Sequence, residues 1–322
     1  MLNERNFPAV DIRLLDDDES IGQLEATGDE INFIQSVRNE QFTHVDFTFF
    51  AGDAQCARKN WKRARDAGSA IIDLSGALLG EDESAQVRSV WVERERGEIW
   101  QPELQPAPAV VAHPAAVTLA LLLLRARKAG AIRTVAAILF EPASEQGQKG
   151  MDELHQQTVN LLSFQALPKD IFDVQIAFNM VARYGEKSQL SLDALESRVR
   201  RHYHSIAGSD AIEPALMALQ APVFHGHSLA IYVEMERPIN RDELSQALAG
   251  DHVVVAGTQE DVQPNNVNTA GQADILVALK NDAERHNGMW LWATADNLRI
   301  AAITAVECAE SMIATRPLGQ VQ

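Results

Sequence analysis

Short apolar runs alternate with helical stretches along the first half of the chain, and this alternation limits the fold more than any other feature. Alternating strands and helices of this kind predict a parallel sheet covered by helices. The predicted strands are "AVDIRLL" (9–15), "HVDFTFFAG" (44–52), "SAIIDLSG" (69–76), "APAVVAHP" (107–114) and "IRTVAAILFEP" (132–142). The predicted helices are "AQCARKNWKRARDAG" (54–68) and "AAVTLALLLLRARKAG" (115–130), the second closed by Gly130.

The second half of the chain has a different pattern, which predicts an α+β arrangement. Amphipathic helices are predicted over 150–164 and 191–208, antiparallel strands over 216–236, 273–282 and 289–296, and a last helix over 297–314. We therefore expect a Rossmann-like domain formed by 1–133 plus 290–322, with an inserted α+β domain at 134–289.

Charge and cysteine content exclude several classes of protein. A net charge of −17 and a pI near 4.9 argue against binding to nucleic acid, which requires a concentrated basic surface. Cys56 and Cys308 give no disulfide framework and suit a reducing cytoplasm. The first residues lack the pattern of a signal peptide, and the apolar run 115–124 is too short to span a bilayer. We expect a cytoplasmic protein that does not associate with a membrane.

The turn at His113-Pro114 separates a predicted strand from a predicted helix. Many α/β enzymes carry a reactive side chain at such a turn, because the start of a helix stabilises negative charge. Here the turn is followed by Ala115, Ala116 and Val117. From these residues alone, the turn is interpreted as a plain connection.

Four separate blocks then indicate a family, in one order along the chain: "RNFP" (5–8), "QIAFN" (175–179), "APVFHGHS" (221–228) and "LWATADNLRIAA" (291–302). From Asn3 to about Met312 the sequence resembles the aspartate-semialdehyde dehydrogenase family and, more closely, its Usg-type paralogues. The resemblance implies a Rossmann domain that binds NADP, an inserted dimerisation domain, a homodimer, and a cysteine that attacks an acyl phosphate or aldehyde.

By this resemblance, the residues that carry the reaction are only partly retained. Ala116 occupies the position of the nucleophilic cysteine, and alanine cannot form a thioester. His227 matches the general base. The two substrate-binding arginines correspond to Gln220 and Leu79, and the glutamine that orients the substrate corresponds to Glu141. Neither Gln220 nor Leu79 can replace the paired, charge-assisted hydrogen bonds of an arginine.

The resemblance also implies an incomplete cofactor site. The sequence begins after the family's first strand and glycine-rich phosphate loop, while Gly52, Ser75, Gly76 and Asn297 correspond to later parts of the site. We expect NADP to bind weakly or not at all; a start site set too late in a longer protein is the alternative. Without the first strand of the family, either the strands 9–15 and 48–52 pair with each other, or the N-terminal segment is displaced and weakly held. We favour displacement, with the sheet carried by the strands that include 48–52, 70–74, 109–113 and 135–140.

No metal site is expected from local spacing. His225 and His227 lie two apart on a predicted strand and share one face, but no third ligand stands at a recognisable distance. Cys56 lies in the first turn of a predicted helix and is interpreted as a packing residue and not as a substitute nucleophile.

Three functions remain open. The first, which we favour, is a family member without dehydrogenase activity that acts as a homodimer and binds an unidentified protein partner or small ligand. The second is an oxidoreductase that acts with NADP on a semialdehyde in amino-acid biosynthesis. The third is a hydrolase or lyase that uses His227 and Glu141 as base and acid, which requires these two side chains to meet in one site.

Overall fold

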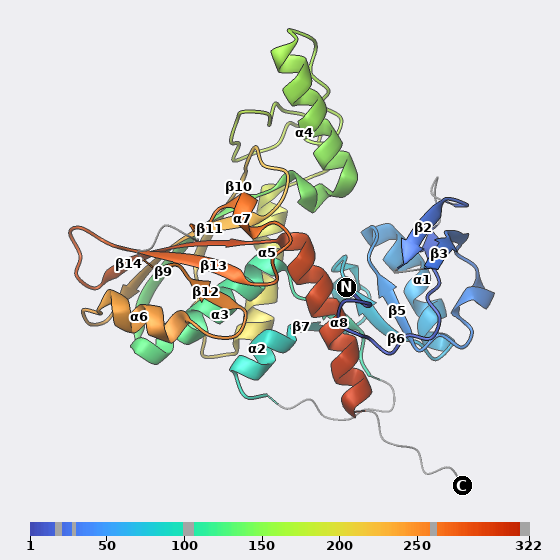
Figure 1. Ribbon diagram of the computed structural model, residues 1–322, viewed down its shortest axis with the longest axis horizontal. Helices are drawn as coiled ribbons and strands as arrows, with labels where there is room; N and C mark the ends of the chain where they lie inside the picture. Colours follow the sequence, from blue (N-terminus) through green and yellow to red (C-terminus); the bar gives the residue numbers. More distant parts are fainter. Residues whose placement is uncertain (17–20, 28–29, 99–105, 258–262, 316–322) are drawn as a thin grey trace. The chain divides into compact units, whose positions relative to one another are not determined.

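The computed structural model describes residues 1–16, 21–27, 30–98, 106–257 and 263–315 (Figure 1). The chain divides into two compact units: unit 1 comprises residues 1–112 and 302–322, and unit 2 comprises residues 113–301. Residues 113–133 and 290–301, which were predicted to belong to the Rossmann-like domain, group with unit 2. The helix that begins at Pro114 packs against two helices of unit 2, and residues 290–295 pair with strands of that unit.

Unit 1 contains the predicted parallel sheet. Its strands are β5 (Phe47–Phe50), β6 (Ala70–Asp73), β7 (Gln86–Arg88) and β8 (Ala109–Val111), ordered β5-β6-β8-β7, with every pair parallel. The sequence analysis missed β7, which is only three residues long. Helix α1 (Ala54–Asp66) follows β5 as predicted, and its first turn is capped by Asp53, which accepts a hydrogen bond from the Cys56 N–H at 2.7 Å.

Shorter elements complete unit 1. A two-stranded parallel pair joins β1 (Leu15–Asp16) to β4 (Gln35–Ser36), and β2 (Leu24–Thr27) pairs antiparallel with β3 (Glu30–Phe33). The remaining elements are η1 (Asn39–Phe42), η2 (Ala77–Gly80) and α2 (Val90–Glu95), together with the later part of α8 (Asn297–Thr315). Ala305, Cys308, Ala309 and Met312 of α8 pack with residues of β6 and β8 in one core cluster.

The N-terminal segment leaves the sheet but keeps two contacts with the rest of unit 1. Residues 9–14 form no strand, and β5 is the outer strand of its sheet among the described residues, so the predicted displacement of 9–15 is correct. Residues 8–11 are exposed, and the contacts are made by Arg5 and Phe7. The Phe7 ring meets Phe47 edge-on, with ring centroids 5.8 Å apart, and Arg5 contacts Glu310 at 2.7 Å and the buried Glu307 at 3.0 Å. An aromatic contact and a shared guanidinium therefore hold the segment to unit 1.

We expect Phe7→Ala to lower the free energy of unfolding by about 1–2 kcal/mol, because it removes a partly buried ring and its edge-on aromatic contact. Val10→Ala is the control, since Val10 is fully exposed, and it should change stability by less than about 0.5 kcal/mol. Urea denaturation followed by circular dichroism measures both. Equal midpoints for the two variants would show that Phe7 contributes nothing to the attachment.

Unit 2 is built on a mixed six-stranded sheet ordered β10-β9-β11-β14-β13-β12. Its strands are β9 (Ile132–Glu141), β10 (Ala215–Gln220), β11 (His227–Met235), β12 (Val253–Val255), β13 (Ile275–Asn281) and β14 (Gly288–Ala295). The assignment of 135–140 to the parallel sheet of unit 1 was wrong. β9 pairs parallel with β10 and antiparallel with β11. A continuous apolar run indicates a buried strand but does not specify which sheet contains it.

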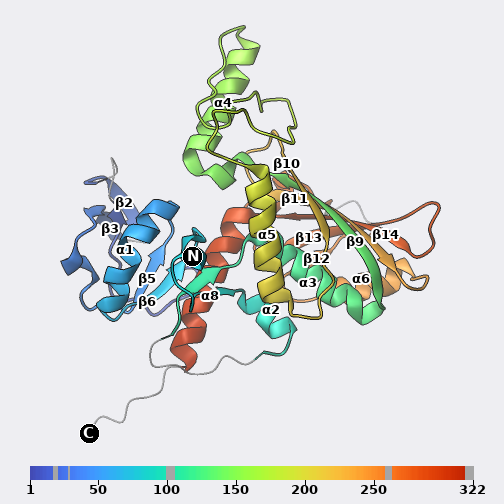
Figure 2. The same cartoon turned by 180° about the vertical axis from the view of Figure 1, so that it is seen from behind.

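Helices cover one face of this sheet. Helices α3 (Pro114–Ala129), α5 (Leu192–Ala207) and α6 (Arg241–Leu248) all contact the strands, and α3 also packs against both α5 and α6 (Figures 1 and 2). The alternation along β14 agrees with this arrangement, because Met289 and Leu291 are buried while Trp290 and Trp292 are more than a third exposed. The two tryptophans therefore lie on the opposite face of the sheet.

Three further elements lie in unit 2: η3 (Ala143–Gln146), α4 (Gly147–Leu162) and α7 (Asn266–Thr269). Helix α4 and the loop after it extend away from the sheet (Figure 2). Among the described helices, none combines the length and apolar character that a membrane crossing requires.

Candidate functional site

The helix start singled out in the sequence lies in unit 2, and His113 forms its N-cap. The Ala115 N–H donates to His113 Nδ1 at 3.2 Å, and the His113 N–H donates to His202 Nδ1 at 2.9 Å. Ala116 follows in the first turn and is fully buried. Burial lowers the pKa of His113 and lowers that of His202 to about 2, so the His202 imidazole is neutral. The first turn of α3 therefore presents a methyl group at position 116 and no nucleophile.

His227, the first residue of β11, lies close to this helix start. Its Nε2 is 3.2 Å from Thr118 Oγ1, and that hydroxyl donates its proton to the Pro114 carbonyl at 3.0 Å. Nε2 must then be the donor to Thr118, which leaves the lone pair on Nδ1. Nδ1 is buried without a partner. Burial, assisted by His113, lowers the pKa of His227 to about 3, so this side chain is a neutral base with a free lone pair.

Two glutamates lie beside His113, Glu145 partly buried and Glu141 fully buried. Glu145 Oε1 is 3.2 Å from His113 Nε2 and accepts from Arg198 Nη2 at 3.1 Å. Burial opposes the ionisation of Glu145, but His113 and Arg198 outweigh it and lower its pKa to about 2. Glu141, the last residue of β9, is fully buried, and neither of its carboxyl oxygens has a hydrogen-bond partner. Burial and the negative charge of Glu145 raise the pKa of Glu141.

Gln220 ends β10 in the same unit, and its amide is fully occupied by hydrogen bonds. Nε2 donates to the carbonyls of Glu141 and Ala221, each at 2.9 Å, and Oε1 accepts from the Tyr184 hydroxyl at 2.8 Å. The side chain is completely buried. A neutral amide with all of its hydrogen bonds made within the protein offers nothing to a carboxylate or phosphate.

Asn297 begins α8 and is also buried. Its Oδ1 accepts from the Ser144 hydroxyl at 3.1 Å and from the Gly226 N–H at 3.2 Å, while its Nδ2 has no partner. Gly226 has a φ of 76° and could not carry a side chain there, because a Cβ would lie 2.9 Å from Thr269. Asn297 thus fixes two loops and retains one unused donor.

The other residues predicted for the cofactor and substrate lie in unit 1. The Ser75 N–H donates to Asp73 Oδ1 at 2.8 Å, and Gly76 follows in the left-handed region with a φ of 75°. Leu79 packs against a hydrophobic core cluster, while Gly52 is exposed. Ser75, Gly76 and Leu79 thus have clear structural roles within unit 1.

The predicted pair of histidines is not formed. His225 is exposed and precedes β11, whereas His227 is the first residue of that strand and is buried. The expectation that they share one strand face was wrong, because residues 222–226 form a turn, with Gly226 at positive φ, and not an extension of the strand.

Comparison with known proteins identifies the family. Residues 123–300, more than half of the chain, match the family "Semialdehyde dehydrogenase, dimerisation domain". A curated protein of Pseudomonas aeruginosa, "USG-1 protein homolog", is 31% identical over 97% of this chain and 92% of its own length. The chain belongs to the aspartate-semialdehyde dehydrogenase family.

Further relatives agree with this assignment. The curated aspartate-semialdehyde dehydrogenase of Rickettsia bellii is 28% identical over 98% of this chain and 93% of its own length. The solved structure of a probable aspartate-semialdehyde dehydrogenase from Pseudomonas aeruginosa has a TM-score of 0.84 and 30% identity, and covers 97% of this chain and 92% of that one. The family assignment therefore extends over both units.

The fold brings together residues that the sequence analysis did not connect. His113, Glu145 and Arg198 come from a helix cap, the η3 turn and helix α5, and their contacts join positions 32 and 53 apart in sequence. No local spacing could have indicated these contacts. The one available signal was His113 itself, a titratable residue at a helix start.

Proposed function

We propose that this chain is a member of the aspartate-semialdehyde dehydrogenase family that lacks the dehydrogenase reaction and acts as a homodimeric, cytoplasmic binding protein. The observation that carries the proposal is Ala116. Its methyl group lies in the first turn of α3, two residues before the threonine that contacts His227, where the resemblance places the nucleophilic cysteine. Without a thiol, neither a thioester nor a thiohemiacetal can form.

The charges around the site support the proposal. An acyl phosphate is anionic and aspartate semialdehyde carries a carboxylate, and each of these negative groups needs positive charge or free donors. The Gln220 amide donates both of its protons within the protein, and the Arg198 guanidinium is paired with Glu145 through Nη2, while its Nε has no partner. Glu141 adds a buried carboxyl group without a donor. Of these three side chains only Arg198 has a free donor, so together they offer an acyl phosphate little positive charge.

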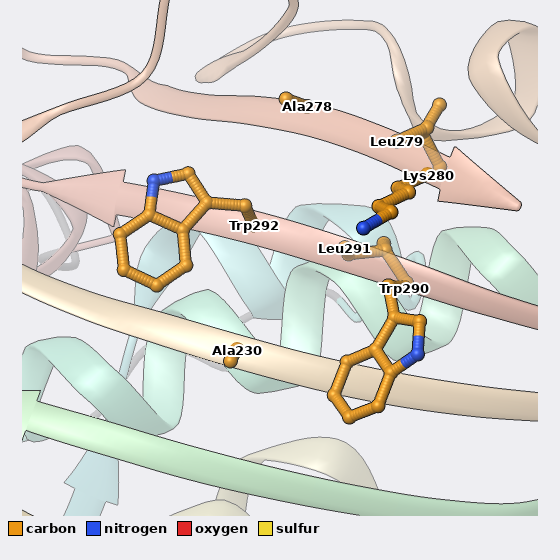
Figure 3. A pocket seen from close by; sticks show the side chains of 7 residues that line it. All are labelled: Ala230, Ala278, Leu279, Lys280, Trp290, Leu291 and Trp292. Carbon is orange, nitrogen blue, oxygen red and sulfur yellow. The ribbon is translucent and has the colours of Figure 1, made fainter. Parts of the chain in front are cut away.

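The exposed face of the six-stranded sheet supports the homodimer. Trp290 and Trp292 protrude on the same side of β14 and, with Lys280 and the neighbouring strands, line an open hollow (Figure 3). Phe140 packs against Trp292 and Tyr232 against Trp290, with ring centroids 5.7 and 5.0 Å apart. An aromatic face of this kind, in a domain whose family is named for dimerisation, is suited to a second copy of the chain.

We also propose that this 322-residue chain binds NADP weakly or not at all. Ser75 and Gly76, two of the residues assigned to the cofactor by resemblance, form a turn closed by the buried Asp73, whose carboxylate already accepts from the Ser75 N–H and hydroxyl, so these two donors are not free for a phosphate. Calorimetric titration tests this. Micromolar affinity for NADP would contradict the proposal.

A second candidate is the usual reaction of the family, with NADP and a semialdehyde in amino-acid biosynthesis. His227 favours it, because this residue remains a neutral base with a free Nδ1. The deciding experiment measures NADPH formation from aspartate semialdehyde, phosphate and NADP. We expect no more turnover than with heat-treated protein. Turnover above that level, abolished by His227→Ala, would establish the second candidate.

A further inference from the structure

Three side chains from three different elements converge in unit 2. They are His113 at the cap of α3, Glu141 at the end of β9 and Glu145 in η3. One ligand atom from each lies within 4.8 Å of the other two. An imidazole nitrogen and two carboxylate oxygens at such distances can surround one small cation.

The state of Glu141 is the second, independent observation. This carboxyl group is fully buried, and both of its oxygens lack a hydrogen-bond partner. Buried polar groups in folded proteins are almost always satisfied, so each exception requires an explanation. Arg198 does not provide one, because it is paired with Glu145. A cation between the three side chains would satisfy Glu141 directly.

We propose that His113, Glu141 and Glu145 bind a divalent transition-metal ion, with zinc(II) preferred. The donor set decides the class of ion. Calcium takes six to eight oxygen ligands, and magnesium prefers oxygen ligands and retains water, whereas a mixture of imidazole and carboxylate suits zinc. Three protein ligands leave one position of a tetrahedral ion open for water or a small molecule. This inference does not depend on the absence of dehydrogenase activity.

The imidazole of His113 must change its tautomer to bind the ion. In the metal-free arrangement its Nδ1 accepts from the Ala115 N–H at 3.2 Å, and Nε2 faces Glu145. Binding through Nε2 requires the proton to be on Nδ1, which breaks the hydrogen bond with the Ala115 N–H and leaves two buried donors facing each other, a cost that the metal–ligand bonds must exceed. The His113 N–H remains bonded to His202, so the backbone of the cap stays in place.

The competing explanation is that Glu141 is a neutral carboxylic acid that shares a proton with Glu145. Such a shared proton would satisfy one oxygen of Glu141 without a metal and would leave the other without a partner. Titration of the chelator-treated, full-length chain with Zn²⁺ by calorimetry separates the two explanations. We expect one ion per chain, a rise in melting temperature on addition of Zn²⁺, and visible d–d absorption when Co²⁺ is used instead.

Two variants locate the ion. Glu141→Gln keeps the shape of the side chain and should weaken zinc binding at least tenfold, and His113→Asn should do the same if the first variant fails to fold. The control is His225→Ala, which removes an exposed histidine next to Phe224, whose carbonyl accepts from the Ser144 N–H, and it should leave the affinity unchanged. Absence of zinc binding, or an affinity unaffected by either cluster variant, would overturn the proposal in favour of the shared proton.

Discussion

Restoring a cysteine at position 116 is expected to restore a reactive thiol without restoring the enzyme. In a Cys56→Ser background, Ala116→Cys places a thiol in the first turn of α3, where the helix dipole lowers the thiol pKa. Cys308 will not interfere, because burial raises its pKa to about 12. Because position 116 is fully buried, we expect iodoacetamide to label the new cysteine slowly, but faster than Cys308 in the interior of α8, as measured by mass spectrometry with the Cys56→Ser protein as control.

The same variant should remain nearly inactive as a dehydrogenase. Loss of a covalent nucleophile typically costs about a million-fold in rate, but the residues of a catalytic unit act together, so restoring one of them recovers little. Gln220 and Glu141 still provide no positive charge for an anionic substrate. If Ala116→Cys alone reached the rate of an active family member, the interpretation of these two positions would be wrong.

The second large effect concerns the tryptophan face of the sheet. We expect Trp292→Glu to raise the dissociation constant of the homodimer by about 100-fold or more, because large aromatic side chains at the centre of an interface contribute most of its binding energy. Sedimentation equilibrium measures the constant. Val10→Glu is the matched control, since it places the same charge at a fully exposed apolar position in unit 1.

Two results would contradict the dimer. A monomeric parent chain at micromolar concentration would exclude it. A dimer that persists unchanged in Trp292→Glu would instead place the interface on another surface. Circular dichroism of the variant separates dissociation from unfolding, and Trp292 is suited to this test because it is already partly exposed in the single chain.

Local patterns were enough to predict most of the elements. The helices at 54–68, 115–130 and 297–314 were found because their caps and apolar periodicity are local properties, and they correspond to α1, α3 and α8. The sheet that contains β9 could not be predicted in the same way, because its partners β10 and β11 lie about 80 to 100 residues away in sequence. The attachment of Arg5 to α8 joins positions about 300 apart.

The sequence predicted only those residues of the candidate site that lie in motifs shared with the family. The resemblance selected Ala116, His227 and Gln220, and all three lie in unit 2. The resemblance did not predict that Glu141 would lack hydrogen-bond partners or that Glu145 would lie beside it. Those two properties depend on burial and on contacts between distant elements, and neither is encoded in local spacing.

The hydrogen bonds of Gln220 limit which residues can replace it. The buried Tyr184 hydroxyl donates to Gln220 Oε1. Arginine at position 220 could not accept this hydrogen bond, because a guanidinium has no acceptor atom. We therefore expect Gln220→Arg to destabilise the protein. The residue types at positions 184 and 220 are coupled through this hydrogen bond, so substitutions at the two positions should have non-additive effects on stability.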